Sequence, residues 1–150
     1  RTDSSAASDV YKRQIKNNLI KKSFLITPNI YEAEILSGIK IKNLEDQIAA
    51  GKKLKNNGCA NVLIKGGHGN LEDIHDVLIT SEAKQHIFKS KKIKTENTHG
   101  TGCTLASAIA VNIGHKNDIT ESIDVSIKYV QNGINKAPGF GSGNGPILHF

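Results

Sequence analysis

Short apolar runs alternate with amphipathic segments along most of this chain. Apolar runs of roughly four to eight residues between polar or glycine residues are typical of buried strands, whereas apolar residues spaced three and four apart are typical of helices. Because strands alternate with helices, the pattern favours an α/β fold whose sheet is rich in parallel strands. It predicts strands at 24–27, 61–65, 76–80 and 85–94, and helices at 29–37, 44–55, 101–113 and 119–135.

Helix-capping and turn residues mark the ends of several predicted elements. Pro28 ends the first strand, and Gly38 and Gly58 close the first two helices. Ser81-Glu82 is expected to turn the chain between the third and fourth strands. The apolar positions expected to face the core are Leu44, Ile48, Ala49 and Leu54 in the second helix, and Ile123, Ile127, Val130 and Ile134 in the last one.

Length and composition limit the class of protein. A chain of 150 residues with 37% apolar residues can form one domain with a moderate core. No window is apolar over the length of a membrane span, and residues 1–14 lack the apolar centre of a secretory signal. We therefore expect a cytoplasmic protein without a membrane partner. Residues 1–14 are expected to be a non-native or disordered leader, and residues 15–150 to carry the fold.

Cysteine spacing and charge narrow the choice further. Cys59 and Cys103 are far apart and are not spaced as metal ligands, so both are expected to be reduced thiols. The net charge is +6, but the lysines are spread along the chain and are not interleaved with aromatic residues. Since nucleic-acid grooves combine basic residues with aromatic stacking platforms, no nucleic-acid partner is expected, and the lysines are assigned to solvated faces.

The motif with the most chemical information is Glu-Asn-Thr-His-Gly-Thr-Gly-Cys-Thr at 96–104. Gly100 and Gly102 flank Thr101 where the third helix should begin, and glycines let the backbone approach a ligand closely. Free amides at the positive end of a helix bind anions, most often phosphate. Cys103 lies in the first turn, where the same field favours thiolate over thiol. The motif predicts a phosphotransfer site; the alternatives are a structural glycine turn and a buried inert cysteine.

Polar residues also follow the first two predicted strands. Asn29 and Glu32 come after the first strand, and Lys65 stands at the end of the second. Because ligands bind beyond the carboxyl ends of parallel strands, these groups and the glycine turn are expected to face one crevice. Asn29 and Glu32 share a helix face and could hold water around Mg²⁺. Alternatively, Asn29 caps the helix and Glu32 faces solvent.

Lys65 could place its ammonium group on the oxygens of a phosphate, or it could be a solvated lysine at a strand end. The adjoining Gly66 and Gly67 would let the backbone approach the ligand. His68 is expected to be a loop residue and not a catalyst.

Taken together, these motifs resemble the hydroxymethylpyrimidine phosphate kinases of thiamine biosynthesis, a family within the ribokinase-like superfamily. Most sugar kinases of the superfamily have aspartate at the position of Cys103. Cysteine at this position is shared with the hydroxymethylpyrimidine branch and with some pyridoxal kinases. Since family members are much longer, the resemblance implies a three-layer α/β/α sandwich of which residues 15–150 are the C-terminal part. Most residues that bind the phosphate acceptor would then belong to the missing N-terminal part. The segments that carry the resemblance are 27–29 with Glu32-Ala33, 65–68, 97–104, and 145–146 with His149-Phe150.

The resemblance implies a kinase that uses ATP and Mg²⁺ to convert 4-amino-5-hydroxymethyl-2-methylpyrimidine phosphate into its diphosphate. Cys103 would take the proton from the hydroxymethyl group, and helix 119–135 and the glycine-rich tail would flank adenine. A pyridoxal kinase is the second hypothesis, a non-catalytic fragment the third, and homodimerisation is left open. The resemblance assigns Cys103, Gly100, Thr101, Gly102 and Lys65 to catalysis, Lys65, Gly67, Thr98, Gly100 and Gly102 to nucleotide binding, and Asn29 and Glu32 to the metal.

Overall fold

The chain divides between Lys91 and Lys92 into two units. The computed structural model describes residues 18–67, 73–140 and 143–149. The predicted leader at 1–14, His68 and Phe150 lie outside these ranges. Among the helices within them, none combines the length and the apolar character that crossing a membrane requires.

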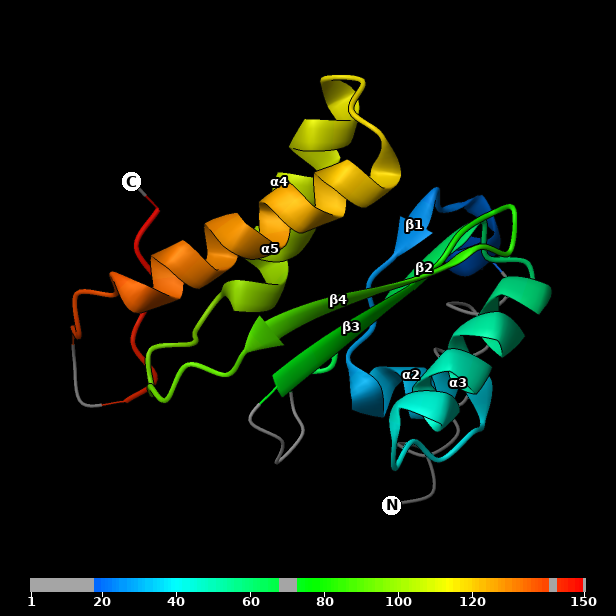
Figure 1. Cartoon of the computed structure of the whole chain (residues 1–150), viewed down its shortest axis with the longest axis horizontal. Helices are drawn as coiled ribbons and strands as arrows, with labels where there is room; N and C mark the ends of the chain where they lie inside the picture. Colours follow the sequence, from blue (N-terminus) through cyan, green and yellow to red (C-terminus); the bar gives the residue numbers. More distant parts are fainter. Residues whose placement is uncertain (1–17, 68–72, 141–142, 150) are drawn as a thin grey trace, which may run out of the picture. The chain divides into compact units, whose positions relative to one another are not determined.

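A mixed sheet forms the centre of the first unit (Figure 1). Its order is β1-β2-β3-β4, in which β1 is parallel to β2 and the other two pairs are antiparallel. The prediction of a sheet rich in parallel strands is therefore wrong for the described strands. The strands are β1 (Leu25–Ile26), β2 (Asn61–Ile64), β3 (Asp73–Ile79) and β4 (Gln85–Lys91).

The antiparallel pairing has a local cause, which is the turn between β3 and β4. The turn lies at the predicted Ser81-Glu82 and is closed by a hydrogen bond from Thr80 N to Lys84 O of 2.9 Å. A connection this short can join only antiparallel strands, because parallel strands need a long crossover. β3 begins at Asp73, earlier than predicted. Its first residues pair with β4 as far as Lys91 through the backbone, and an apolar pattern does not reveal such pairing.

Within the described ranges, the first unit also contains the short 3-10 helix η2 (Ile20–Lys22) and the helices α2 (Ile30–Ser37) and α3 (Leu44–Asn56). As predicted, Gly38 ends α2, with φ of 72° in the left-handed region that glycine adopts most readily. β2 is buried along its whole length, as expected for an apolar strand between neighbours. The helices and the sheet share a core of Ile20, Ala33, Ala50, Leu54, Cys59, Val62 and Ile64.

The buried face of α3 differs from the predicted one. Ala49 is exposed, so its assignment to the core is wrong. Gln47 is buried although it is polar, and Gly51 lets the helix approach β3, since a Cβ at Gly51 would lie 2.8 Å from Ile79 Cγ1. The apolar pattern could not register either residue. The buried residues of α3 are Gln47, Ala50, Gly51 and Leu54.

The helices α4 (Thr101–Gly114) and α5 (Ile119–Asn135) form most of the second unit (Figure 1). Both begin where the apolar periodicity predicts. Asp118 caps α5 by accepting a hydrogen bond of 2.9 Å from Thr120 N. The two helices pack against each other, and the predicted stripe on α5 is confirmed: Ile123, Ile127 and Val130 are buried and Ile134 is half-buried.

Candidate functional site

The glycine turn before α4 leaves the first amides of the helix open. Gly100 is the residue that precedes the helix, and its φ of 84° lies in the left-handed region that strains other residues. Helix geometry gives the first amides no carbonyl partner, and among the described residues no side chain caps α4. Thr101 N is turned back to Thr98 O at 3.3 Å. The amides of Gly102 and Cys103 are therefore available to an anion.

The thiol of Cys103 lies at the surface of this turn. Cys103 is the third residue of α4 and is an exposed free cysteine, so the alternative of a buried inert cysteine is wrong. Cys59 is the contrast, because it is only 4% exposed and burial raises the pKa of its thiol to about 11. Both cysteines are free, as predicted. Of the two thiols, only that of Cys103 can meet a substrate.

The C-terminal segment 143–149 runs beside the glycine turn. His99 N donates to Gly145 O at 3.1 Å, and His99 forms an isolated parallel bridge with Pro146. Gly145 permits this approach, since a Cβ there would lie 2.2 Å from Asn97 Oδ1. The Gly-Pro pair near the end of the sequence thus belongs to the same local structure as the motif at 96–104.

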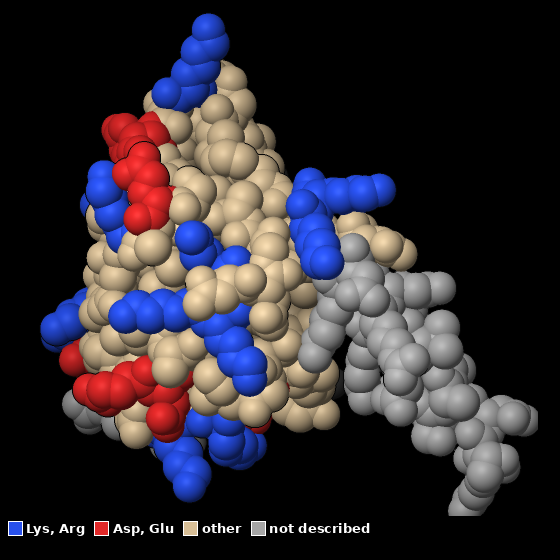
Figure 2. Space-filling view, turned by 90° about the vertical axis from the view of Figure 1, so that its right-hand side faces the viewer, with Lys and Arg blue, Asp and Glu red and all other residues tan. Residues whose placement is uncertain are grey.

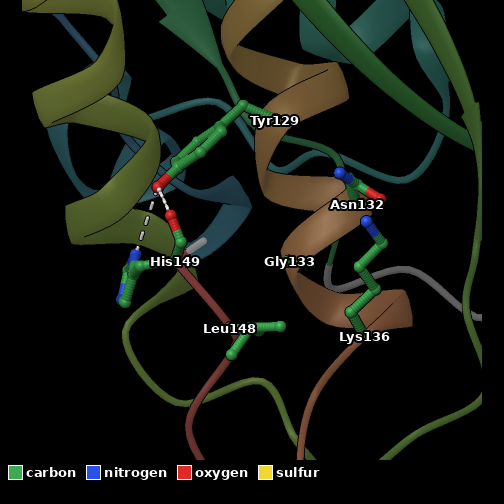
Figure 3. Close-up of a pocket in the computed structure, with 6 residues that line it drawn as sticks. All are labelled: Tyr129, Asn132, Gly133, Lys136, Leu148 and His149. Atoms are coloured by element: carbon green, nitrogen blue, oxygen red, sulfur yellow. Dashed lines mark hydrogen bonds between the residues drawn. The ribbon is translucent and has the colours of Figure 1, made fainter.

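The same segment continues to a pocket on the C-terminal half of α5 (Figure 3). Leu148 N donates to Gly133 O at 3.0 Å, and Tyr129 Oη donates to His149 O at 2.8 Å. Figure 3 shows Tyr129 and His149 on one side of the pocket and Asn132 and Lys136 on the other. The space between them, including the open mouth, is about 230 Å³. The lining residues are Tyr129, Asn132, Gly133, Lys136, Leu148 and His149.

In the first unit, Asn29 and Glu32 form a reciprocal cap at the start of α2. Asn29 Oδ1 accepts from Glu32 N at 2.8 Å, and Glu32 Oε2 accepts from Asn29 N at 2.8 Å. The geometry is that of a capping box, with Glu32 exposed. Within the described ranges, no group of three or more His, Cys, Asp and Glu residues could hold a metal ion. The second carboxylate oxygen of Glu32 fits the one-carboxylate, largely hydrated binding that Mg²⁺ accepts beside phosphates.

Lys65 lies next to this cap. Lys65 N donates to Pro28 O at 2.9 Å, and Lys65 forms an isolated parallel bridge with Asn29. Lys65 and the Asn29–Glu32 pair therefore meet at one end of the sheet, as predicted from their positions after two neighbouring strands. The glycine turn belongs to the second unit, so its convergence with Lys65, Asn29 and Glu32 on one crevice stays a prediction.

Two buried polar residues that the sequence did not single out hold the turn after Lys65. Gly66 N donates to Asp76 Oδ1 at 2.7 Å, and Gln47 Nε2 donates to Ile64 O at 3.0 Å. Asp76 is only 6% exposed, and burial raises the pKa of its carboxyl group, against the hydrogen bond from Gly66 N. Gly67 is exposed, so a ligand could reach its backbone. The apolar pattern held no signal for these two residues, because it marks apolar positions only.

Comparison with known proteins places these motifs in one family. The phosphomethylpyrimidine kinase family matches residues 1–148. The thiamine biosynthesis bifunctional protein of Geobacter sulfurreducens is 41% identical over 91% of this chain and 28% of its own length. The hydroxymethylpyrimidine/phosphomethylpyrimidine kinase of Bacillus subtilis is 38% identical over 91% of this chain and 50% of its own length.

The fold agrees with this assignment. The ADP complex of Bacillus subtilis pyridoxal kinase superposes with a TM-score of 0.86 at 30% identity, and the match covers 93% of this chain and 53% of that one. This likeness confirms the expected ribokinase-like α/β fold. The chain spans about half the length of that structure and of the B. subtilis relative, and less of the bifunctional protein. By its sequence motifs, its fold and its match over residues 1–148, the chain belongs to the phosphomethylpyrimidine kinase family.

Proposed function

We propose that this chain supplies the phosphate- and nucleotide-binding part of a kinase that transfers the γ-phosphoryl group of ATP to 4-amino-5-hydroxymethyl-2-methylpyrimidine phosphate. The observation that carries the proposal is the exposed thiol of Cys103 in the first turn of α4, behind a glycine turn with open amides. Phosphoryl transfer needs positioning and charge stabilisation more than covalent chemistry. An open helix N-terminus supplies both for an anion.

Each part of the glycine turn has a distinct task in this proposal. The amides of Gly102 and Cys103 bind the γ-phosphoryl oxygens and stabilise the charge that develops during transfer. The acceptor attacks through an oxygen of its own phosphate group, and Cys103 takes the proton from that group where it is still protonated, a step that requires a base within hydrogen-bond reach. Thr101 and Gly100 shape the turn, and exposed Thr98 borders it.

The pocket on α5 is our candidate for adenine. It offers the phenol ring of Tyr129, the amide of Asn132 and the imidazole of His149 beside the apolar side chain of Leu148, a mixture that suits a base. The C-terminal segment connects it to the glycine turn, and because an extended chain rises at most about 3.6 Å per residue, Pro146 and His149 are no more than about 11 Å apart. The turn and the pocket could therefore hold two ends of one nucleotide.

In the first unit, Lys65 and Gly67 are proposed to bind the phosphates, and Asn29 and Glu32 to support the metal. The ammonium of Lys65 would neutralise charge on the phosphate oxygens, and the open backbone of Gly67 would approach them. Mg²⁺, when bound, supplies charge neutralisation between phosphates. Glu32 would hold the hydrated ion through its uncommitted oxygen, while its other oxygen keeps the cap.

The second candidate is a pyridoxal kinase, which the likeness to the B. subtilis pyridoxal kinase favours. Pyridoxal accepts the phosphoryl group on a hydroxymethyl oxygen, and the pyrimidine phosphate accepts it on a phosphate oxygen. Both oxygens belong to a side arm of an aromatic ring, so the residues above would serve either acceptor. The name of the 38% identical relative favours the pyrimidine, and that of the 41% identical relative names thiamine biosynthesis. The third candidate, a fragment without catalytic activity, is consistent with the partial coverage of these relatives.

The test is an assay of ADP formation by this chain and by its Cys103→Ala variant, with pyrimidine phosphate and pyridoxal as parallel acceptors. We expect turnover with the pyrimidine and a loss of about 10²-fold or more in the variant, the usual effect of removing a general base. Ser107→Ala, an exposed change on the same helix, is the matched control. Nucleotide binding without turnover would support the non-catalytic fragment, and equal turnover by the variant would refute the role of Cys103.

A further inference from the structure

The ladder between β2 and β3 stops at an unusual point, directly before Lys65. Ile64 pairs with Val77 in the last backbone pair of the ladder. Lys65 turns instead toward the other side, where its amide binds Pro28 O and the residue bridges with Asn29. The backbone groups next to this divergence have lost their regular partners, and buried polar groups of this kind must find others.

Two side chains supply those partners. Gln47 Nε2, from α3, donates to both Ile64 O at 3.0 Å and His75 O at 2.9 Å. Asp76 Oδ1, from β3, accepts from Gly66 N at 2.7 Å. These side-chain hydrogen bonds thus take the place of the inter-strand backbone hydrogen bonds that are missing on both sides of Lys65.

Packing leaves the turn little freedom around these bonds. Gln47 is 4% exposed and Asp76 is 6% exposed, so neither can exchange its partner for water without cost. A Cβ at Gly66 would lie 2.2 Å from His75 O, which shows that the two backbones are in direct contact. The positions of Lys65 and Gly67 are therefore determined by the groups that flank Gly66.

The charge of Asp76 also bears on Lys65. The charges that face its carboxyl group are those of Lys65 and His75, and both act to lower its pKa. Asp76 reaches Lys65 through the turn, because its carboxyl group binds the amide of Gly66, the residue that follows Lys65. A preformed turn of this kind spares a ligand the entropy of ordering it.

We propose that Asp76, together with Gln47, is a positioning residue that holds Lys65 and the exposed backbone of Gly67 ready for the phosphates of a nucleotide. This inference rests on the proposed function, since it assigns the ligand of the same site. Asp76 and Gln47 touch the turn and not the ligand, so their effect on binding is indirect.

The experiment is a double-mutant cycle on this chain with Asp76→Ala and Lys65→Ala, using Mg²⁺-ADP as the probe. Affinity is measured by calorimetric titration, and exchange of the Gly66 amide proton is followed by NMR. We expect Asp76→Ala to weaken ADP binding by about tenfold, the worth of one hydrogen bond, and to speed exchange at Gly66. When Lys65 is already replaced by alanine, adding Asp76→Ala should weaken ADP binding further by less than about threefold, because the effects of coupled residues are not additive.

Asp76→Asn and Asp73→Ala complete the design. Asn keeps an acceptor for Gly66 N and should restore most of the affinity, and it remains informative if the alanine variant does not fold. Asp73 is exposed on the same strand, so its replacement should leave binding unchanged. Two results would contradict the positioning role and leave Asp76 a structural residue. One is unchanged ADP affinity in Asp76→Ala, and the other is an equal loss of ADP affinity whether position 65 is lysine or alanine. If the unmodified chain does not bind ADP, the proposed function fails, and the positioning role falls with it.

Discussion

At the scale of single residues, burial separates groups of identical chemistry. Cys59 and Cys103 are both free thiols, but one is packed in the core and the other lies at the surface of the glycine turn. Asp73 and Asp76 are on the same strand, but only Asp76 is buried. Because burial disfavours the charged form of a group, the members of each pair should differ in measurable chemistry.

We predict that one of the two thiols reacts with a disulfide reagent in the folded chain. Cys103 should react while the chain is folded, because its thiol is exposed, whereas the buried Cys59, with a pKa of about 11, should react only after unfolding. Counting released chromophore before and after adding denaturant checks this. Mg²⁺-ADP should slow the reaction of Cys103 if the proposed phosphate site is correct. Reaction of both thiols in the folded chain would contradict the structure.

Asp76 should make stability depend on pH in the direction opposite to an ordinary ion-paired carboxylate. Because burial raises its pKa in the folded state above the ordinary 3.8, the folded state binds more protons than the unfolded one as pH rises past that value. The contribution of Asp76 to stability therefore falls as pH increases through this window. Urea unfolding across pH should show the stability of the Asp76→Asn variant rising relative to the unmodified chain. A constant difference at all pH values would disprove the shift.

At the scale of elements, the start of α2 combines a structural and a proposed functional role. The reciprocal hydrogen bonds between Asn29 and Glu32 explain why the helix begins at Ile30. They also occupy one oxygen of each side chain that was assigned to the metal. The capping role follows from the geometry, and the metal role depends on the remaining oxygen of Glu32.

Two substitutions separate these roles. Asn29→Ala should lower the free energy of unfolding by about 1 kcal/mol, because it removes the cap. Glu32→Gln should leave stability almost unchanged, because glutamine also closes a capping box. The same variant should weaken the dependence of ADP binding on Mg²⁺, since it removes the charge. Calorimetric titration with and without Mg²⁺ measures this, and an unchanged dependence would leave Glu32 with the capping role alone.

At the scale of the whole molecule, the positive charge is spread and partly paired. On the face in Figure 2, lysine side chains lie scattered over uncharged surface and beside acidic groups. Ion pairs join Lys40 to Glu34, Lys84 to Glu82 and Lys128 to Asp124. A nucleic acid binds along a continuous basic surface, and the expectation that no such partner takes part stays a prediction from the sequence.

We predict that nucleotide stabilises the chain and that the pyrimidine substrate alone does not. The motifs proposed for phosphates and adenine all lie within this chain, which spans about half of the B. subtilis kinase. A ligand at about 100 times its Kd adds about 2.7 kcal/mol to the stability of the folded state. Thermal unfolding with Mg²⁺-ADP and with hydroxymethylpyrimidine phosphate compares the two. Stabilisation by the pyrimidine alone would place an acceptor site within this half.

Local sequence by itself determined the features that depend on neighbouring residues. The helix after the glycine turn, the end of α2 at Gly38 and the turn between β3 and β4 follow from glycine conformation and apolar period, and each was predicted. The placement of Cys103 at the start of a helix belongs to the same class. The motif at 96–104 also indicated phosphate chemistry, and together with the segments at 27–33, 65–68 and 145–150 it indicated the family.

Only the tertiary structure decided the features that join distant parts of the chain. It paired β2 with β3 in the antiparallel sense, turned Gln47 and not Ala49 into the core, and placed Asp76 against Gly66. It also brought Gly145 beside His99. These contacts join residues that are far apart in sequence, and buried polar side chains carry no mark in an apolar pattern, so their partners are known only once the chain has folded.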